Sequence, residues 1–346
     1  MQKRQRSTSA KGKKPSTDHA HPRFLSTLKN HTAAVTGLQF SPGGQYLATI
    51  SLDRTLRLWS MDALEGADHQ HQRINIEDGD PVCLRVSADG KYVLVVLDRC
   101  NTVQVYGYQK KKGKDGKASR LLKALAEQLH STATTVVSVD LSSKYVLTCG
   151  AEDVRVNLLS LKGELLHSFT TKQLRNNRAR FSAAGRLVAV AARTNEVKVW
   201  RVEEDRKGNF TGVEKKMQAT AQGHQRAVTD LAFVGEDALV TCSLDGTWKV
   251  WNVGVRYEQG EDPRCTRTAA VEGFPSFSML ALSPDGRRLA LAYASDFAVC
   301  TVADGRTVDV VRAAHAGDVE CIGWDASGTL LATGAADKLV RVWRFP

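Results

Sequence analysis

Hydrophobic and polar residues alternate in short runs along most of the chain, which predicts β-strands. In Leu56–Trp59, for example, Leu56 and Leu58 point one way while Arg57 and Trp59 point the other. A short helix-like spacing occurs only at Leu121–Leu129, in a stretch expected to be a loop. The first turns after these runs carry Ser, Pro, Asp and Gly, which suits type I turn chemistry. They lie at Ser41–Gly44, Ser87–Gly90, Ser142–Tyr145, Ser182–Gly185, Gly235–Asp237, Ser283–Gly286 and Ala326–Gly328.

The runs are organised into a repeat of roughly 45 residues, a period typical of repeat architectures. The clearest copies are His31–Trp59, His224–Trp251 and His315–Trp343. The step from His to Asp is 22, 21 and 22 residues in these copies, and the step from Asp to Trp is six in all three. Such constant offsets indicate one structural unit that recurs along the chain.

Seven copies of this unit fill residues 24–346 and predict an all-β, seven-bladed β-propeller. A closed ring of four-stranded blades leaves only short, protected sheet edges. The last copy ends at Pro346, after its third strand, so we expect Phe24–Lys29 to supply the missing outer strand and close the ring. The predicted organisation is a basic disordered tail over residues 1–22 and a propeller over residues 23–346.

The His, the Asp and the Leu-Trp or Val-Trp strand ends resemble the WD-repeat family across about residues 24–346. The resemblance implies a non-catalytic scaffold that binds proteins and needs no cofactor or metal. It also implies a hydrogen-bonded chain from the Trp indole through Ser and His to Asp within a blade. The residues assigned to it are His31, Ser51, Asp53 and Trp59, then His224, Ser243, Asp245 and Trp251, then His315, Asp337 and Trp343.

A Ser, His and Asp set is also the composition of a catalytic triad. The set recurs here at the same offsets, whereas a nucleophile would be a single special copy in a cleft, so we favour the structural role. In the last copy Ala335 stands where Ser is expected, which predicts an incomplete chain in that blade.

Three segments are similar to a narrower branch of the family, the transducin beta-like proteins. They are Gln45–Trp59, Ser160–Asn177 and Asp245–Pro263. This similarity implies attachment to the endoplasmic reticulum by an N-terminal anchor, a cytosolic propeller and a role in stress signalling. The present chain departs from that pattern, because no apolar anchor precedes its basic tail and it ends directly after the seventh repeat.

In WD-repeat proteins partners usually contact the rim around the central channel, at positions that flank the first strand of each blade and precede the turn Asp. Leu52 and Leu244 are apolar at such positions, as a protein-contact surface would be. The resemblance assigns partner binding to Ala34, Thr36, Leu52, Arg99, Glu152, Arg175, Asn177, Arg193, Ala227, Thr229, Leu244, Asp318 and Glu320.

The formal net charge is +11, and much of it comes from the tail. A basic segment attracts phosphate groups, so an RNA- or ribosome-associated propeller, or contact with an anionic membrane, stays open as an alternative. The basic residues concerned are Lys3, Arg4, Arg6, Lys11, Lys13 and Lys14 in the tail and Lys110, Lys111, Lys112 and Lys114 in a loop.

The seven cysteines include no CxxC pair and are expected to be free thiols of a reducing compartment. No apolar run approaches the ~20 residues of a membrane-spanning helix. We therefore expect a cytoplasmic monomer, with the cytosolic face of the endoplasmic reticulum or the nucleus as the alternatives.

Overall fold

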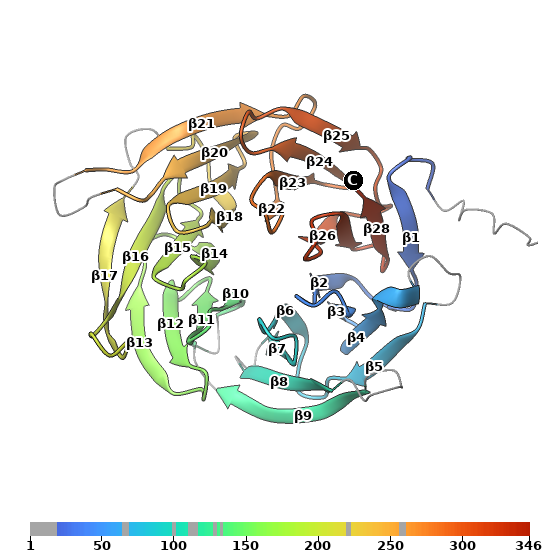
Figure 1. Ribbon diagram of the computed structural model, residues 1–346, viewed down its shortest axis with the longest axis horizontal. Coiled ribbons are helices and arrows are strands. Elements are labelled where there is room, and N and C mark those ends of the chain that lie inside the picture. Colours follow the sequence, from blue (N-terminus) through green and yellow to red (C-terminus); the bar gives the residue numbers. More distant parts are fainter. Residues whose placement is uncertain are drawn as a thin grey trace, which may run out of the picture.

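A computed structural model describes residues 19–63, 69–98, 102–109, 117–126, 130–131, 134–218, 223–255 and 261–346. Its strands form seven four-stranded antiparallel sheets, which are arranged as blades around a central axis (Figure 1). The prediction of an all-β, seven-bladed propeller is confirmed. Besides strands, the described residues contain one short 3-10 helix, η1 (Met61–Ala63).

Each blade is an antiparallel meander whose first strand lies nearest the axis and whose fourth strand lies at the outside (Figure 1). Blade one consists of β2 (Val35–Phe40), β3 (Tyr46–Ser51), β4 (Thr55–Ser60) and β5 (His71–Asn75). Blade two consists of β6 (Pro81–Val86), β7 (Tyr92–Leu97), β8 (Thr102–Gln109) and β9 (Lys117–Ala126). Blade three consists of β10 (Val136–Leu141), β11 (Tyr145–Gly150), β12 (Arg155–Ser160) and β13 (Leu165–Thr170).

The remaining blades continue the same order. Blade four consists of β14 (Asn176–Phe181), β15 (Leu187–Ala192), β16 (Val197–Glu204) and β17 (Phe210–Gln218). Blade five consists of β18 (Val228–Val234), β19 (Ala238–Ser243), β20 (Thr247–Asn252) and β21 (Arg264–Ala270). Blade six consists of β22 (Met279–Leu282), β23 (Arg288–Tyr293), β24 (Asp296–Thr301) and β25 (Thr307–Val311). Blade seven consists of β26 (Val319–Trp324), β27 (Leu330–Ala335), β28 (Val340–Arg344) and β1 (Phe24–Leu28).

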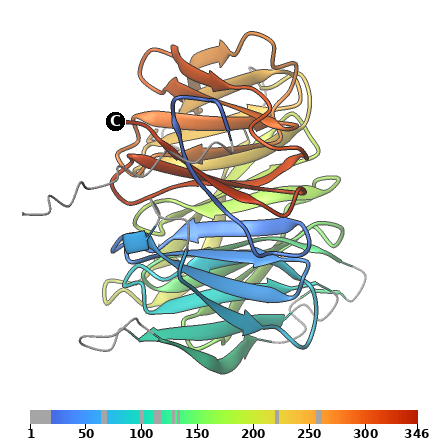
Figure 2. The same cartoon turned by 90° about the vertical axis from the view of Figure 1, so that its right-hand side faces the viewer.

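The ring closes through β1, which pairs antiparallel with β28 although the two strands lie at opposite ends of the chain (Figures 1 and 2). Ser26 lies opposite Val342 and Leu28 opposite Val340. The Arg344 amide also donates a hydrogen bond to the Arg23 carbonyl oxygen at 2.7 Å. The prediction that Phe24–Lys29 closes the ring is therefore confirmed, with the strand ending at Leu28.

The helix-like spacing at Leu121–Leu129 does not produce a helix in the part of it that the structure describes. Leu121 and Lys123 belong to β9 and lie opposite Tyr106 and Val105 of β8. Several register shifts along this pair absorb the irregular alternation of β9. Pairing with β8 satisfies the backbone groups of this segment, so tertiary context outweighs a weak local preference.

The hydrophobic core lies between neighbouring blades rather than at the axis. Ile50 and Leu56 of blade one, for example, belong to one buried cluster with Val93 and Val95 of blade two. Equivalent clusters join the other neighbouring sheets. Each blade thus buries both of its faces against its neighbours, which explains why its strands are rich in Val, Leu and Ala.

The meander gives the ring two distinct faces. Because strand direction alternates, the first strands of all blades start at the same face, which also carries the turns between second and third strands. We call this the entry face. The opposite face carries the turns between first and second strands and between third and fourth strands, and we call it the far face.

Candidate functional site

A continuous hydrogen-bonded chain crosses blade one from its third strand to the loop before its first strand. The Trp59 indole Nε1 donates to Thr49 Oγ1 at 2.9 Å. Thr49 Oγ1 lies 2.8 Å from His31 Nε2, and His31 Nδ1 lies 2.9 Å from Asp53 Oδ2. Thr32 and Thr55 donate further hydrogen bonds to the same carboxylate. Every member of this buried chain has a partner, as a stabilising polar network requires.

The hydroxyl in this chain belongs to Thr49, which corrects the assignment of Ser51. Ser51 instead donates to the Ala33 carbonyl oxygen at 2.9 Å and accepts from the Asp53 amide at 3.1 Å. In the pairing of β3 with β4, Ser51 lies opposite Thr55, while Thr49 lies two positions nearer Trp59. Ser51 therefore shapes the turn that presents Asp53 and does not link the indole to the imidazole.

Blades five and seven repeat the arrangement. In blade five Thr241 Oγ1 lies 2.9 Å from Trp251 Nε1 and 2.8 Å from His224 Nε2, and His224 Nδ1 lies 3.0 Å from Asp245. Ser243 again binds backbone, at the Arg226 carbonyl oxygen.

In blade seven Thr333 lies 3.0 Å from Trp343 Nε1 and 2.7 Å from His315 Nε2, and Asp337 completes the chain at 3.0 Å. The expectation that Ala335 leaves this chain incomplete is wrong, because Thr333 supplies the hydroxyl.

Blade three carries a fourth, shorter version that the sequence analysis missed. His130 lies 2.9 Å from Asp153 and 3.0 Å from Thr148, while Leu159 replaces the tryptophan. The signal that would have revealed it is the similar step from His to Asp, which is 23 residues here and 21 or 22 in the other three blades.

The geometry accounts for the charge state of these histidines. Burial lowers the pKa of His31, His130 and His224, and this outweighs the opposite effect of their aspartates. A neutral imidazole with its proton on Nδ1 donates to Asp and accepts at Nε2 from the Thr hydroxyl, which in turn accepts from the indole. All polar atoms are then satisfied. Because Thr49 and Thr241 are completely buried, no substrate can reach these hydroxyls.

The described rim residues that were predicted to bind partners lie on the entry face, but three of them also join neighbouring blades. Thr36 Oγ1 donates to the Pro81 carbonyl oxygen at 2.7 Å. Asn177 and Thr229 make corresponding bonds to the carbonyl oxygens of Val228 and Phe277, at 2.7 and 2.9 Å. These half-buried side chains therefore have a structural role within the ring.

Two charged residues of the rim that lie far apart in the sequence form an ion pair in the structure. Arg175, in the loop before β14, forms an ion pair with Glu152 of blade three at 2.9 Å. Arg193 is exposed on the turn after β15. The side chains of Asp318 and Glu320 are exposed at the start of β26. Partial burial of the Glu320 carboxyl, together with the Asp318 charge, raises the pKa of Glu320. The entry face is thus acidic at blade seven, while the basic character of blade four depends mainly on Arg193.

Apolar side chains are also exposed on the entry face. Leu52 and Leu244 are 46% and 36% exposed on the turns before Asp53 and Asp245. Leu174, in the loop before β14, is 80% exposed and was not among the predicted rim residues. Ala34 and Ala227 are partly buried beside the two turns.

Some predicted residues lie outside the described part of the chain. They are Arg99, the tail residues Lys3, Arg4, Arg6, Lys11, Lys13 and Lys14, and the loop residues Lys110, Lys111, Lys112 and Lys114. Among the described residues, three or more His, Cys, Asp or Glu side chains nowhere gather as a metal site would require. The same residues include no helix of the length and apolarity needed to cross a membrane.

Comparison with known proteins agrees with this geometry. The sequence profile of the WD40 family (WD domain, G-beta repeat) matches residues 22–60, 215–252 and 305–344, which contain the complete chains of blades one, five and seven. Human transducin beta-like protein 2 is 30% identical over 329 residues, covering 93% of this chain and 72% of its own. The chain belongs to the WD-repeat family, among the relatives of transducin beta-like protein 2.

Other relatives cover the same propeller. Mouse transducin beta-like protein 2 is 30% identical over 328 residues, with 93% of this chain and 72% of its own covered. Rat apoptotic protease-activating factor 1 is 23% identical over 322 residues, which is 92% of this chain but 22% of that larger protein. A WD-repeat propeller is typically a non-catalytic scaffold fold that binds protein partners.

Proposed function

We propose that this WD-repeat propeller is a non-catalytic scaffold that binds a protein partner on its entry face. The observation that carries the proposal is the exposure of Leu52, Leu174 and Leu244 on that face. Large apolar side chains exposed beside charged groups are typical of protein-contact surfaces. The three leucines come from different parts of the ring, so a partner that covers all of them spans the axis.

The charges of this face suit a partner of mixed charge. Asp318 and Glu320 offer carboxylates at blade seven, while Arg193 offers a cation at blade four. Arg175 and Glu152 satisfy each other and would add little net attraction unless the partner separates them. This arrangement favours a defined orientation of the partner on the ring.

The test is quantitative capture of cellular proteins on the intact chain and on the double variant Leu52→Asp, Leu244→Asp. We expect the variant to capture at least about tenfold less of a specific partner, since a charge introduced at a buried contact costs more than about 1 kcal/mol. Leu161→Asp is the matched control, because Leu161 is 51% exposed on the far face, in the turn between β12 and β13.

The outcome that contradicts this proposal is equal capture by the intact chain and the double variant. The endoplasmic reticulum assignment and the RNA- or ribosome-associated alternative stay predictions, because they depend on the narrower resemblance and on basic segments outside the described residues. Capture of RNA in ~50 mM salt that is lost in ~300 mM salt would favour the RNA alternative, since phosphate contacts are strongly salt-dependent.

A further inference from the structure

A cavity of about 480 Å³ lies at the far face, where the first strands of the blades end. Its volume falls within the usual range of small-ligand pockets. Phe181, Val234, Leu282 and Trp324 are the last or nearly last residues of four such strands, and all four line it. The cavity is therefore at the opposite end of the axis from the rim residues.

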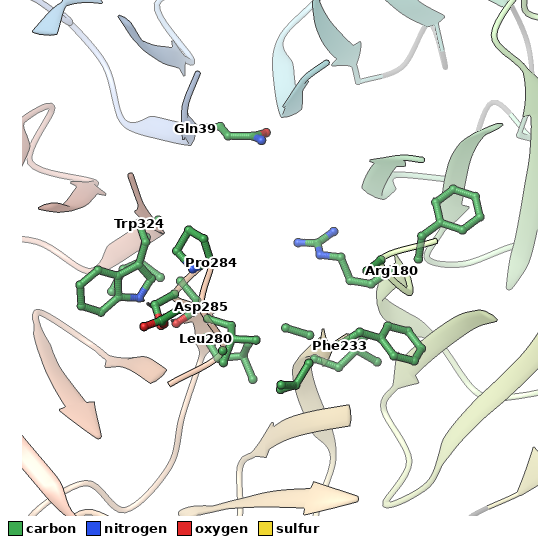
Figure 3. Close-up of a pocket in the computed structure, with 18 of the residues that line it drawn as sticks. Gln39, Arg180, Phe233, Leu280, Pro284, Asp285 and Trp324 are labelled. Atoms are coloured by element: carbon green, nitrogen blue, oxygen red, sulfur yellow. Dashed lines mark hydrogen bonds between the residues drawn. The ribbon is translucent and has the colours of Figure 1, made fainter. Parts of the chain in front are cut away.

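The wall of the cavity has two chemically different sides. Blades five, six and seven supply apolar groups, including Phe233, Leu280, Pro284 and Trp324. Blade four supplies Arg180, whose guanidinium projects into the open space toward that apolar side (Figure 3). Gln39 of blade one and Arg85 of blade two also line the cavity. An apolar wall that faces a few convergent polar groups is the usual composition of a ligand site.

The other two arginines near the axis already have carboxylate partners. Arg85 Nε lies 2.9 Å from Asp140, whose second oxygen accepts from the Phe181 amide at 2.8 Å. Arg178 Nε lies 3.0 Å from Asp230. The two pairs link blade two to three and blade four to five, so they stabilise the ring.

Arg180 differs from Arg85 and Arg178, because among the described residues it forms no ion pair. Its Nη1 donates to Ser138 Oγ at 2.9 Å and to the Ala179 carbonyl oxygen at 3.2 Å, while Nη2 and Nε bind nothing in that part of the chain. Burial and the charges of Arg85 and Arg178 lower the pKa of Arg180 to about 9. The three arginines near the axis are thus matched by two carboxylates, and Arg180 is the cation without one.

One acid is among the described residues that line the cavity, and its hydrogen bonds lie within its own turn. Asp285, in the turn after β22, accepts from Ser283 Oγ at 2.6 Å and from the Arg287 amide at 3.0 Å. It holds its own turn and leaves the guanidinium of Arg180 available.

We propose that this far-face cavity binds a carboxylate attached to an apolar group, with the carboxylate on Arg180 and the apolar group against Phe233, Leu280 and Trp324. Guanidinium groups favour carboxylates because two parallel N–H donors match two oxygens. A free small acid and the C-terminal residue of a peptide share this chemistry. The inference does not depend on the proposed entry-face function, since it uses a different face and different residues.

The test measures binding of 3-phenylpropionate and of its neutral amide, 3-phenylpropanamide, by ligand-observed NMR and calorimetry. We expect the acid to bind at least about tenfold more tightly than the amide, because a hydrogen bond to a charged group outweighs one to a neutral group. Inorganic phosphate, which lacks the apolar part, is expected to bind at least about tenfold more weakly than the acid.

Arg180→Gln should reduce affinity for 3-phenylpropionate at least about tenfold and should reduce affinity for the amide much less. Arg306→Gln is the control, because Arg306 is exposed on the turn between β24 and β25 and does not line the cavity. Arg180→Lys, which keeps one charge but loses the planar fork, should bind with intermediate affinity. The thermal midpoint of each variant verifies that the ring is folded.

Two peptides of sequence Gly-Gly-Ser-Phe, one with a free C-terminal carboxylate and one amidated, identify the source of the ligand. Tighter binding of the free-carboxylate peptide than of 3-phenylpropionate supports a chain end as the occupant, and the reverse order supports a small acid. The proposal is overturned if neither acid binds, if acid and amide bind equally, if phosphate binds as tightly as the acid, or if folded Arg180→Gln binds the acid as the intact chain does.

Discussion

The odd-numbered and even-numbered blades of this ring have the same four-stranded topology but different interiors. The comparable position of the second strand is Thr49, Thr148, Thr241 and Thr333 in blades one, three, five and seven. In blades two, four and six the same position is Val95, Val190 and Leu291. Histidine and aspartate accompany the threonine in all four odd blades.

This alternation teaches that the polar chain is not needed to form a blade. Val95, Val190 and Leu291 are all completely buried and fill the site by packing alone. A buried polar network becomes valuable only where every member is satisfied, because a partly satisfied network costs more than an apolar core. In the odd blades, hydrogen bonds therefore fix the position of the loop that carries the histidine. In the even blades, the same site is stabilised by apolar packing.

The largest effect is expected from removing a histidine of an odd blade. His224→Ala leaves the Thr241 hydroxyl and the Asp245 carboxylate without their shared partner, so we expect the free energy of unfolding to fall by about 3 kcal/mol. Urea unfolding followed by tryptophan fluorescence measures this change. His167→Ala on β13, where the side chain is half-exposed, is the control and should cost less than about 1 kcal/mol. Equal losses in the two variants would mean that the chain adds no stability of its own.

The second effect distinguishes the two hydroxyls of one blade. Thr241→Val keeps the shape of the side chain but deprives Trp251 Nε1 and His224 Nε2 of a partner, which should cost about 2 kcal/mol. Ser243→Ala removes one bond to backbone and should cost about 1 kcal/mol. Urea unfolding of the two variants measures both losses of stability. A larger loss for Ser243→Ala would mean that the serine, as predicted from the sequence, links the indole to the imidazole.

The reciprocal change in an even blade sharpens the same comparison. Val95→Thr places a hydroxyl in blade two among Ile50, Leu56 and Leu84 of one buried cluster, in a blade that has no tryptophan at the position of Trp59. Because an unpaired buried hydroxyl costs about 1–3 kcal/mol in proteins, the substitution should destabilise the ring although it copies the residue of the odd blades. Unchanged stability would show that the even blades accept polar groups as readily as the odd ones.

The sequence was sufficient to predict the fold because three features agree on one topology. They are the repeat spacing, the turn residues and the missing fourth strand of the last repeat. The strand at Phe24–Leu28 could be placed from the missing outer strand alone. The hydroxyl of the polar chain could not be assigned in this way, since Thr49 and Ser51 lie two residues apart on one strand and point to the same side. The odd-even pattern of threonine and aliphatic residues was nevertheless visible along the chain.

Contacts between blades were beyond the reach of sequence patterns. Glu152 and Arg175 are 23 positions apart and belong to different blades, so their ion pair depends on how two loops meet in space. The far-face cavity is similar, because Arg180 and Trp324 converge only when the ring is closed. Periodicity within a blade carries no information about such distances.

The smallest effect expected is a gradual loss of stability in mild acid, to which the buried histidine of blade five contributes. Burial lowers the pKa of His224 in the folded chain below its ordinary value near 6.5. The unfolded chain therefore binds more protons as the pH falls through about 6.5, so folding stability decreases from that point downward. The pKa of Asp245 is also lowered, because hydrogen bonds from Thr247 and Gln225 outweigh the effect of burial, and this adds a further loss in stronger acid.

Urea midpoints measured between about pH 8 and about pH 5 test this dependence. The intact chain should lose stability below about pH 6.5, and His224→Gln should show a shallower slope because one titrating histidine is gone. Because only His224 differs between the two proteins, the difference in slope reports the contribution of blade five. His31 and His130, whose pKa values burial also lowers, contribute equally to both slopes. If the slopes are identical, His224 is protonated as readily in the folded ring as in the unfolded chain, and the neutral imidazole assigned to it is wrong.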